Sequence, residues 1–85
     1  MNDMSTFHSV IEIISSIKDK ELLEDFLVGI TTPKERTEIG QRLMVVQRLL
    51  KNEPHHRIAE DLGVGVATVT RGSKELQDGK FKVLR

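Results

Sequence analysis

Small hydroxyl, methyl and cationic groups gather at helical spacing between residues 66 and 74. If this segment is a helix, its outward positions are Val66, Ala67, Thr68, Thr70 and Lys74. Threonine hydroxyls hydrogen-bond the edges of bases, and small apolar groups contact the methyl group of thymine. The pattern therefore predicts a helix whose N-terminal residues meet base edges in the major groove of double-stranded DNA.

A turn at Gly63 is expected to position this helix. A helix-turn-helix needs a small residue four positions before the turn glycine, and that residue is Ala59. Glycine also suits the left-handed backbone that ends a helix at such a corner. We therefore expect a helix-turn-helix over about residues 54–76, with a buried seam of Ile58, Leu62, Val64 and Val69. The alternative is an ordinary helical hairpin in which threonine and alanine only fill the surface.

Gly72 interrupts the second helix of this motif, and glycine inside a helix costs about 1 kcal/mol relative to alanine. Its missing side chain leaves space, and Arg71 next to it would place a planar, permanently charged guanidinium at the rim of that space. One interpretation is a slot for a small molecule beneath the helix. Close packing against another helix and an early helix end are the alternatives.

The remaining apolar residues also recur at three- and four-residue steps, which predicts an all-α fold. A long central helix is expected to begin at Thr32, with Pro33 at its first position, and to end near Asn52. The apolar stripes are broad for such short helices, so we expect burial against a partner subunit. The stripes comprise Phe7, Val10, Ile11, Ile14 and Ile17; then Leu22, Leu23, Phe26, Leu27 and Ile30; and then Ile39, Leu43, Val46 and Leu50.

Length and composition limit the possibilities further. The 85 residues are expected to form a single domain over 1–85, and a chain of this size gains stability from oligomerisation. Cysteine is absent, which excludes disulfides and thiolate metal sites. No basic leader or long apolar run is present, so we expect a cytoplasmic protein with no membrane partner.

The charge is unevenly distributed along the chain. Residues 1–40 carry four Lys and Arg against eight Asp and Glu, whereas residues 41–85 carry nine against five. Positive charge therefore coincides with the predicted DNA-reading motif.

Two sequence runs resemble one known family closely. GVGVATVTRGS, together with TTPKERTEIGQRLMVVQRLL upstream, resembles the tryptophan repressor family of bacterial transcription regulators. The likeness covers residues 31–76, extends weakly through the N-terminal helices, and is expected to fail after Gln77. It implies a small all-α domain with a helix-turn-helix, assembled as an intertwined homodimer. It also implies L-tryptophan as corepressor and double-stranded operator DNA as partner.

The resemblance gives particular residues a role in ligand binding. The family's two arginines that sandwich the indole ring match Arg42 and Arg71, and guanidinium planes stack well on aromatic rings. Thr32 and the backbone of Thr31 match positions at the polar end of the ligand. Gly72 matches the glycine that leaves room for it. Ligand binding would tilt the second helix of the motif into its DNA-competent pose, so the two affinities should be coupled.

The chain departs from the family pattern in three places. Glu75 replaces a small hydroxyl residue, and its carboxylate would either pair with the ligand's ammonium group or repel the ligand's carboxylate. The segment 52–56 appears one residue shorter than its counterpart and carries two histidines, of which His56 is expected near a DNA phosphate. The last residues, KFKVLR, differ from the family's final dimer-forming helix, so the first three helices would have to carry dimerisation.

No enzymatic or metal site is expected. His55 and His56 are adjacent and lack an evident third ligand. The serines have no histidine and carboxylate partners at an assignable spacing. Three functions therefore remain: a tryptophan-responsive dimeric repressor, a ligand-independent DNA-binding regulator in which Phe81 fills the glycine space, and a helical protein-interaction module.

Overall fold

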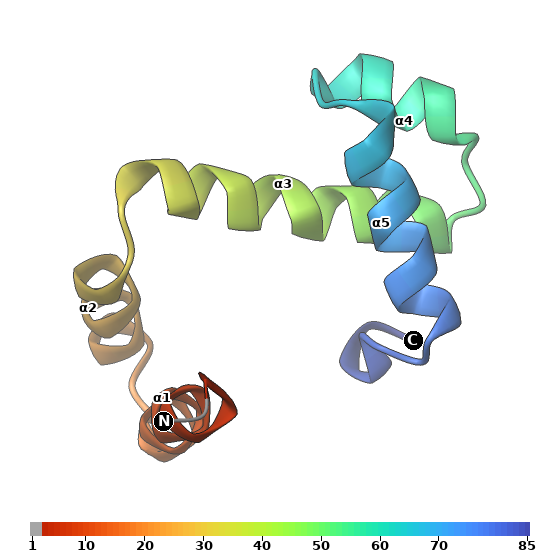
Figure 1. Ribbon diagram of the computed structural model, residues 1–85. Coiled ribbons are helices and arrows are strands. Elements are labelled where there is room, and N and C mark those ends of the chain that lie inside the picture. The colour runs from red at the N-terminus through yellow and green to blue at the C-terminus, as the bar shows by residue number, and fades with distance from the viewer. Residues whose placement is uncertain (1–2) are drawn as a thin grey trace. The chain divides into compact units, whose positions relative to one another are not determined.

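The computed structural model describes residues 3–85, and within them the chain is all-α, as expected (Figure 1). The helices are α1 (Asp3–Ser16), α2 (Lys20–Ile30), α3 (Pro33–Leu50), α4 (His55–Leu62), α5 (Val66–Gln77) and the short 3-10 helix η1 (Lys82–Leu84). The chain divides into two compact units, which are residues 1–33 and residues 34–85. Within residues 3–85, no helix combines the length and the apolar composition that a membrane span requires.

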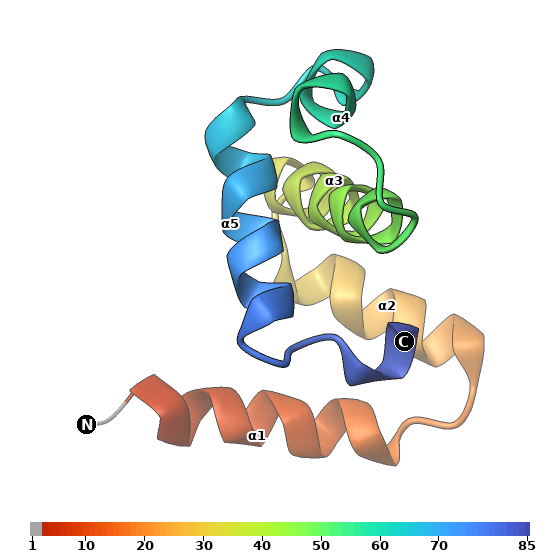
Figure 2. The same ribbon diagram turned by 90° about the vertical axis from the view of Figure 1, so that its right-hand side faces the viewer.

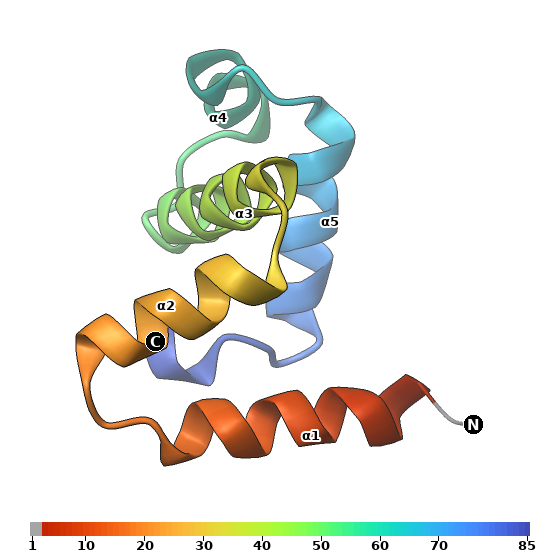
Figure 3. The ribbon, with the colours of Figure 1, turned by 90° about the vertical axis from the view of Figure 1, so that its left-hand side faces the viewer.

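The first unit consists of two helices, and the chain reverses direction between them (Figure 3). Asp19 caps α2 by accepting a hydrogen bond from the backbone N–H of Leu22 at 3.2 Å, as an N-cap carboxylate does. None of the described side chains of this unit is buried, and Phe7 and Leu22 are 56% and 61% exposed. The apolar stripes predicted for these helices are therefore present, but their side chains are exposed or only half-buried.

The second unit contains the expected helix-turn-helix, in which α4 and α5 meet at Gly63. Gly63 has φ 66° and ψ 32°, the left-handed backbone predicted for this corner. The backbone N–H of Val64 donates to the carbonyl of Ala59 at 3.0 Å and closes the turn. Ile58, Ala59 and Val69 are buried, and Leu62 and Val64 pack against them. The predicted seam is confirmed.

The contribution of α3 to this core differs from the expected stripe. Val46 is buried as predicted, but Ile39 and Leu43 are 54% and 43% exposed. Val45, which the stripe did not include, is 1% exposed and joins the buried cluster with Ile58. The reason is that α5 passes across one side of α3 (Figure 2) at its C-terminal half (Figure 1), so the side chains covered by α5 lie in that half.

The connection from α3 to α4 is held by one arginine. The central helix ends at Leu50, two residues before the predicted end, and Asn52 takes a left-handed backbone with φ 62°. Arg48 donates to Glu53 from Nε at 2.8 Å and to Asp61 from Nη2 at 2.7 Å. The guanidinium thus joins the end of α3, the loop and the end of α4, and fixes where the helix-turn-helix begins.

These contacts shift the pKa values of all three groups. The hydrogen bond from Arg48 lowers the pKa of Glu53 below its ordinary 4.5 and that of Asp61 below its ordinary 3.8, although partial desolvation opposes both shifts. The same hydrogen bonds, first from Glu53 and then from Asp61, raise the pKa of Arg48. The network is therefore ionised at neutral pH.

The network predicts a specific acid sensitivity of folding. A carboxylate whose pKa is lower in the folded state stabilises the fold above its unfolded pKa, and this contribution is lost as pH falls through the folded pKa. We expect the free energy of unfolding to fall below about pH 5, and to fall less steeply in the double variant Glu53→Gln/Asp61→Asn. Urea unfolding from pH 7 to 3 measures this. Glu60→Gln, which removes an exposed carboxylate from the same helix, should keep the wild-type slope; an equal slope in the double variant would contradict the account.

The core predicts a large difference between two valines of the second unit. Val69 is fully buried whereas Val83 is 93% exposed. Val69→Ala should lower the free energy of unfolding by about 2 kcal/mol, because it removes two buried methyl groups and leaves a cavity. Val83→Ala should change it by less than about 0.5 kcal/mol. Chemical denaturation of both variants tests this, and equal losses would show that the assigned core is wrong.

Candidate functional site

Three stripes of side chains run along α5, each facing a different environment. Val69, Gly72 and Leu76 face the rest of the unit, and Val69 is fully buried. Thr68, Arg71 and Glu75 border a pocket between α5 and α3. The third stripe is exposed and comprises Val66, Ala67, Thr70 and Lys74. One helix therefore contributes to the core, to a pocket and to the surface.

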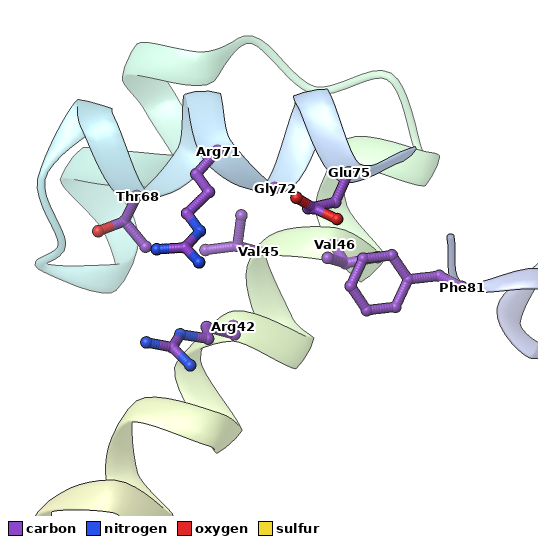
Figure 4. Close-up of a pocket in the computed structure, with 8 residues that line it drawn as sticks. All are labelled: Arg42, Val45, Val46, Thr68, Arg71, Gly72, Glu75 and Phe81. Carbon is purple, nitrogen blue, oxygen red and sulfur yellow. The ribbon is translucent and has the colours of Figure 1, made fainter. Parts of the chain in front are cut away.

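The pocket has a volume of about 320 Å³, at the small end of the range for sites that bind small molecules. Figure 4 shows its lining side chains. The helix α3 supplies Arg42, Val45 and Val46, the helix α5 supplies Thr68, Arg71, Gly72 and Glu75, and the turn after α5 supplies Phe81. Four of the six residues predicted to bind a ligand, Arg42, Arg71, Gly72 and Glu75, are thus brought together.

Charged groups lie at opposite ends of this pocket. The guanidinium groups of Arg42 and Arg71 lie near Thr68, and the Glu75 carboxylate lies beside Phe81 above Val46 (Figure 4). The valine side chains form an apolar floor between them. Such a site suits a ligand that carries both charges and a flat apolar part, because guanidinium planes stack on rings and pair with carboxylates.

Gly72 allows α5 to approach α3 closely. A Cβ at this position would lie 3.2 Å from Cγ1 of Val45 and 3.5 Å from Cδ1 of Leu49. The helix continues past Gly72 to Gln77, so the early helix end considered from the sequence is wrong. Close packing is confirmed, and Gly72 also lines the pocket. The missing side chain therefore serves both the packing and the open space.

All six residues predicted to contact DNA are exposed. Val66 is 55% exposed at the start of α5, and His56 is exposed in the first turn of α4. Thr68 is exposed as well but borders the pocket, on the same side of the helix as Arg71. Its side chain thus lies between the candidate ligand site and the exposed stripe.

Thr31 and Thr32 belong to the first unit, in the turn before α3. The hydroxyl of Thr31 donates to the carbonyl of Leu27 at 2.5 Å. Contact of these two residues with a ligand stays a prediction. Among residues 4–85, no group of three or more His, Asp or Glu side chains is placed to hold a metal ion.

Sequence reasoning gave Val45 no place in this site and did not predict Phe81 as part of a ligand-binding pocket. Val45 is adjacent to Val46 and has the same chemistry, so only the packing of α5 identifies it. Phe81 was considered only as a filler of the glycine space, yet the pocket is open beside it. The one available signal was that an aromatic residue follows soon after a glycine, Gly79, at which the chain can reverse.

Comparison with known proteins gives consistent results. The family model described as Trp repressor protein matches residues 5–83, beyond Gln77 where the likeness was expected to end. A Trp operon repressor homolog of Vibrio campbellii is 40% identical over 72 residues, covering 84% of this chain and 72% of its own length. The homolog of Chlamydia caviae is 40% identical over 75 residues, covering 85% and 74%, and that of Vibrio cholerae is 38% identical over 74 residues, covering 86% and 72%. The chain therefore belongs to the Trp repressor family, whose members are transcriptional regulators and not enzymes.

Proposed function

We propose that this chain is a transcriptional repressor that binds operator DNA through α5 and is activated by L-tryptophan. One observation carries the proposal: the pocket stripe and the exposed stripe lie on the same 12-residue helix. A ligand that contacts Arg71 or Thr68 therefore bears directly on the orientation of Thr70 and Lys74. The relatives are named as Trp operon repressor homologs, which agrees with this assignment.

The chemistry of the pocket supports an aromatic amino acid as the corepressor. An indole ring between the guanidinium planes of Arg42 and Arg71 gains stacking and cation–π energy in a partly desolvated site. The ammonium group of the same ligand is attracted by the Glu75 carboxylate, and its carboxylate by the arginines. Of the two outcomes that the sequence left open for Glu75, we infer pairing with the ammonium group, because the arginines lie together at the other end of the pocket.

We further propose that the active form is an intertwined homodimer. In the first unit the described side chains include exposed apolar residues on both helices, such as Phe7, Ile11, Leu22 and Ile30. Patches of this kind mark surfaces that a partner covers. A two-fold dimer also presents two α5 helices, and paired reading helices contact successive major grooves of one duplex. The repressor would work in the cytoplasm, where bacterial DNA is located.

The ligand-independent alternative depends on Phe81. In that version the ring occupies the glycine space and DNA binding needs no corepressor. Phe81 lines the pocket, which supports this alternative. The open volume beside the ring supports a bound ligand instead. Calorimetry with L-tryptophan separates the two, because the alternative gives no heat at millimolar ligand.

Removal of the Arg71 guanidinium should uncouple the ligand from DNA. We expect Arg71→Ala to raise the Kd for L-tryptophan about tenfold, because stacking and charge pairing are both lost. The stimulation of DNA binding by tryptophan should fall in parallel. Isothermal titration and a mobility-shift assay on duplexes selected from a random library measure both effects. Lys51→Ala, which removes an exposed cation outside the pocket, is the matched control, and an Arg71→Ala variant that still responds fully to tryptophan would contradict the proposed site.

Two side chains of the exposed stripe should affect DNA binding in different ways. Thr70→Ala should change the base preference at one operator position by about 1–3 kcal/mol if the hydroxyl meets a base edge. Lys74→Ala should weaken binding to all sequences equally and reduce the slope of log affinity against log salt by about 1, because it removes a phosphate contact. Repeated selection from random duplexes at two salt concentrations measures both. Unaltered base preference in Thr70→Ala would show that this stripe does not face the bases.

A further inference from the structure

The chain after α5 turns back towards the pocket through two residues with left-handed backbone. Gly79 has φ 89° and Phe81 has φ 63°. This conformation is ordinary for glycine, but it is unfavourable for a residue that carries a Cβ. Phe81 is nonetheless half-buried and borders the pocket. Other contacts must therefore hold the turn in place.

Arg85 supplies such contacts. Its guanidinium donates to the carbonyl of Lys80 from Nε at 3.1 Å and from Nη2 at 3.0 Å, and Nη2 also donates to the carbonyl of Leu76. A cation near the last carbonyls of a helix is favoured by the helix dipole as well. The turn that carries Phe81 is thus fastened to the C-terminal end of α5.

The Phe81 ring forms the end wall of the pocket beside Glu75. Figure 4 shows the ring next to Val46, below the Glu75 carboxylate and away from the guanidinium groups of Arg42 and Arg71. The face of an aromatic ring carries partial negative charge and attracts a cation, as the carboxylate does. This end of the pocket therefore attracts a positive group that lies on an apolar surface.

We propose that Phe81 is a specificity-determining residue, which together with Glu75 selects ligands that carry an ammonium group. The proposal rests on the proposed function, since it assigns a role within the same pocket. It follows from the polarity of the site: two guanidinium groups at one end exclude a cation, and a carboxylate beside an aromatic ring at the other end attracts one. The carboxylate of an amino acid pairs with the guanidinium groups, and its ammonium group pairs with the end formed by Glu75 and Phe81. The corresponding acid without an ammonium group pairs with the guanidinium groups alone.

The test compares two ligands that differ in the ammonium group alone. L-tryptophan and indole-3-propionate share the indole ring and the carboxylate, and isothermal titration gives a Kd for each. The wild-type protein should prefer tryptophan. Phe81→Leu keeps an apolar wall but removes the ring, and should reduce that preference about fivefold. Phe81→Tyr keeps the ring and should retain the preference, and Val83→Ala, in the same turn but 93% exposed, is the matched control.

Each other outcome overturns the proposal in a distinguishable way. If wild type binds tryptophan and Phe81→Leu keeps the full preference, Phe81 has no part in selection while the proposed function stands. If Phe81→Leu weakens the binding of both ligands equally, Phe81 supports the shape of the pocket and does not select between ligands. If wild type binds neither ligand but Phe81→Leu binds tryptophan, the Phe81 ring blocks the pocket. If no variant binds either ligand, the proposed function itself fails.

Discussion

The close approach of α5 to α3 at Gly72 is the contact on which the rest of the second unit depends. A Cβ there would lie 3.2 Å from Cγ1 of Val45, which would have to shift by a few tenths of an ångström, and 3.5 Å from Cδ1 of Leu49, which is ordinary van der Waals contact. Glycine weakens the helix by about 1 kcal/mol. The approach offsets this cost, because it lets Val45 join the core of Ile58 and Val69. The same approach leaves the pocket next to the contact, with Gly72 in its wall.

The rotation of α5 about its axis follows from this contact. With Val69 and Gly72 turned towards the core, the helical period turns Arg71 and Glu75 to the pocket and Thr70 and Lys74 to the surface. A rigid helix cannot tilt one stripe without tilting the others. The proposed coupling of tryptophan and DNA thus needs no long chain of contacts, because in that proposal both ligands bias the orientation of a single element.

Much of the fold could be predicted from the sequence, because short-range patterns determine it. Gly63 marks the corner, Ala59 is spaced correctly before it, and Pro33 marks the start of the central helix. The core face of α3 was only partly predictable. Periodicity shows that a helix has an apolar face, but the crossing point of α5 decides that Val45 is buried and Ile39 is exposed.

The candidate site was also predictable in part. The family resemblance gave Arg42, Arg71, Gly72 and Glu75, and these four line one pocket. It could not give Phe81, because the position of that ring depends on two left-handed residues and on Arg85. It also could not show that Thr68 lies on the pocket side of α5, since helical spacing alone leaves the rotation of the helix undetermined.

The affinity of L-tryptophan for the free protein and for the protein bound to a selected duplex tests the central claim most directly. If both ligands act on the orientation of α5, tryptophan should bind the DNA complex more tightly than the free protein. The factor should equal that by which tryptophan tightens DNA binding, because coupling between two sites is reciprocal. Equal tryptophan affinities for free and DNA-bound protein would contradict the account.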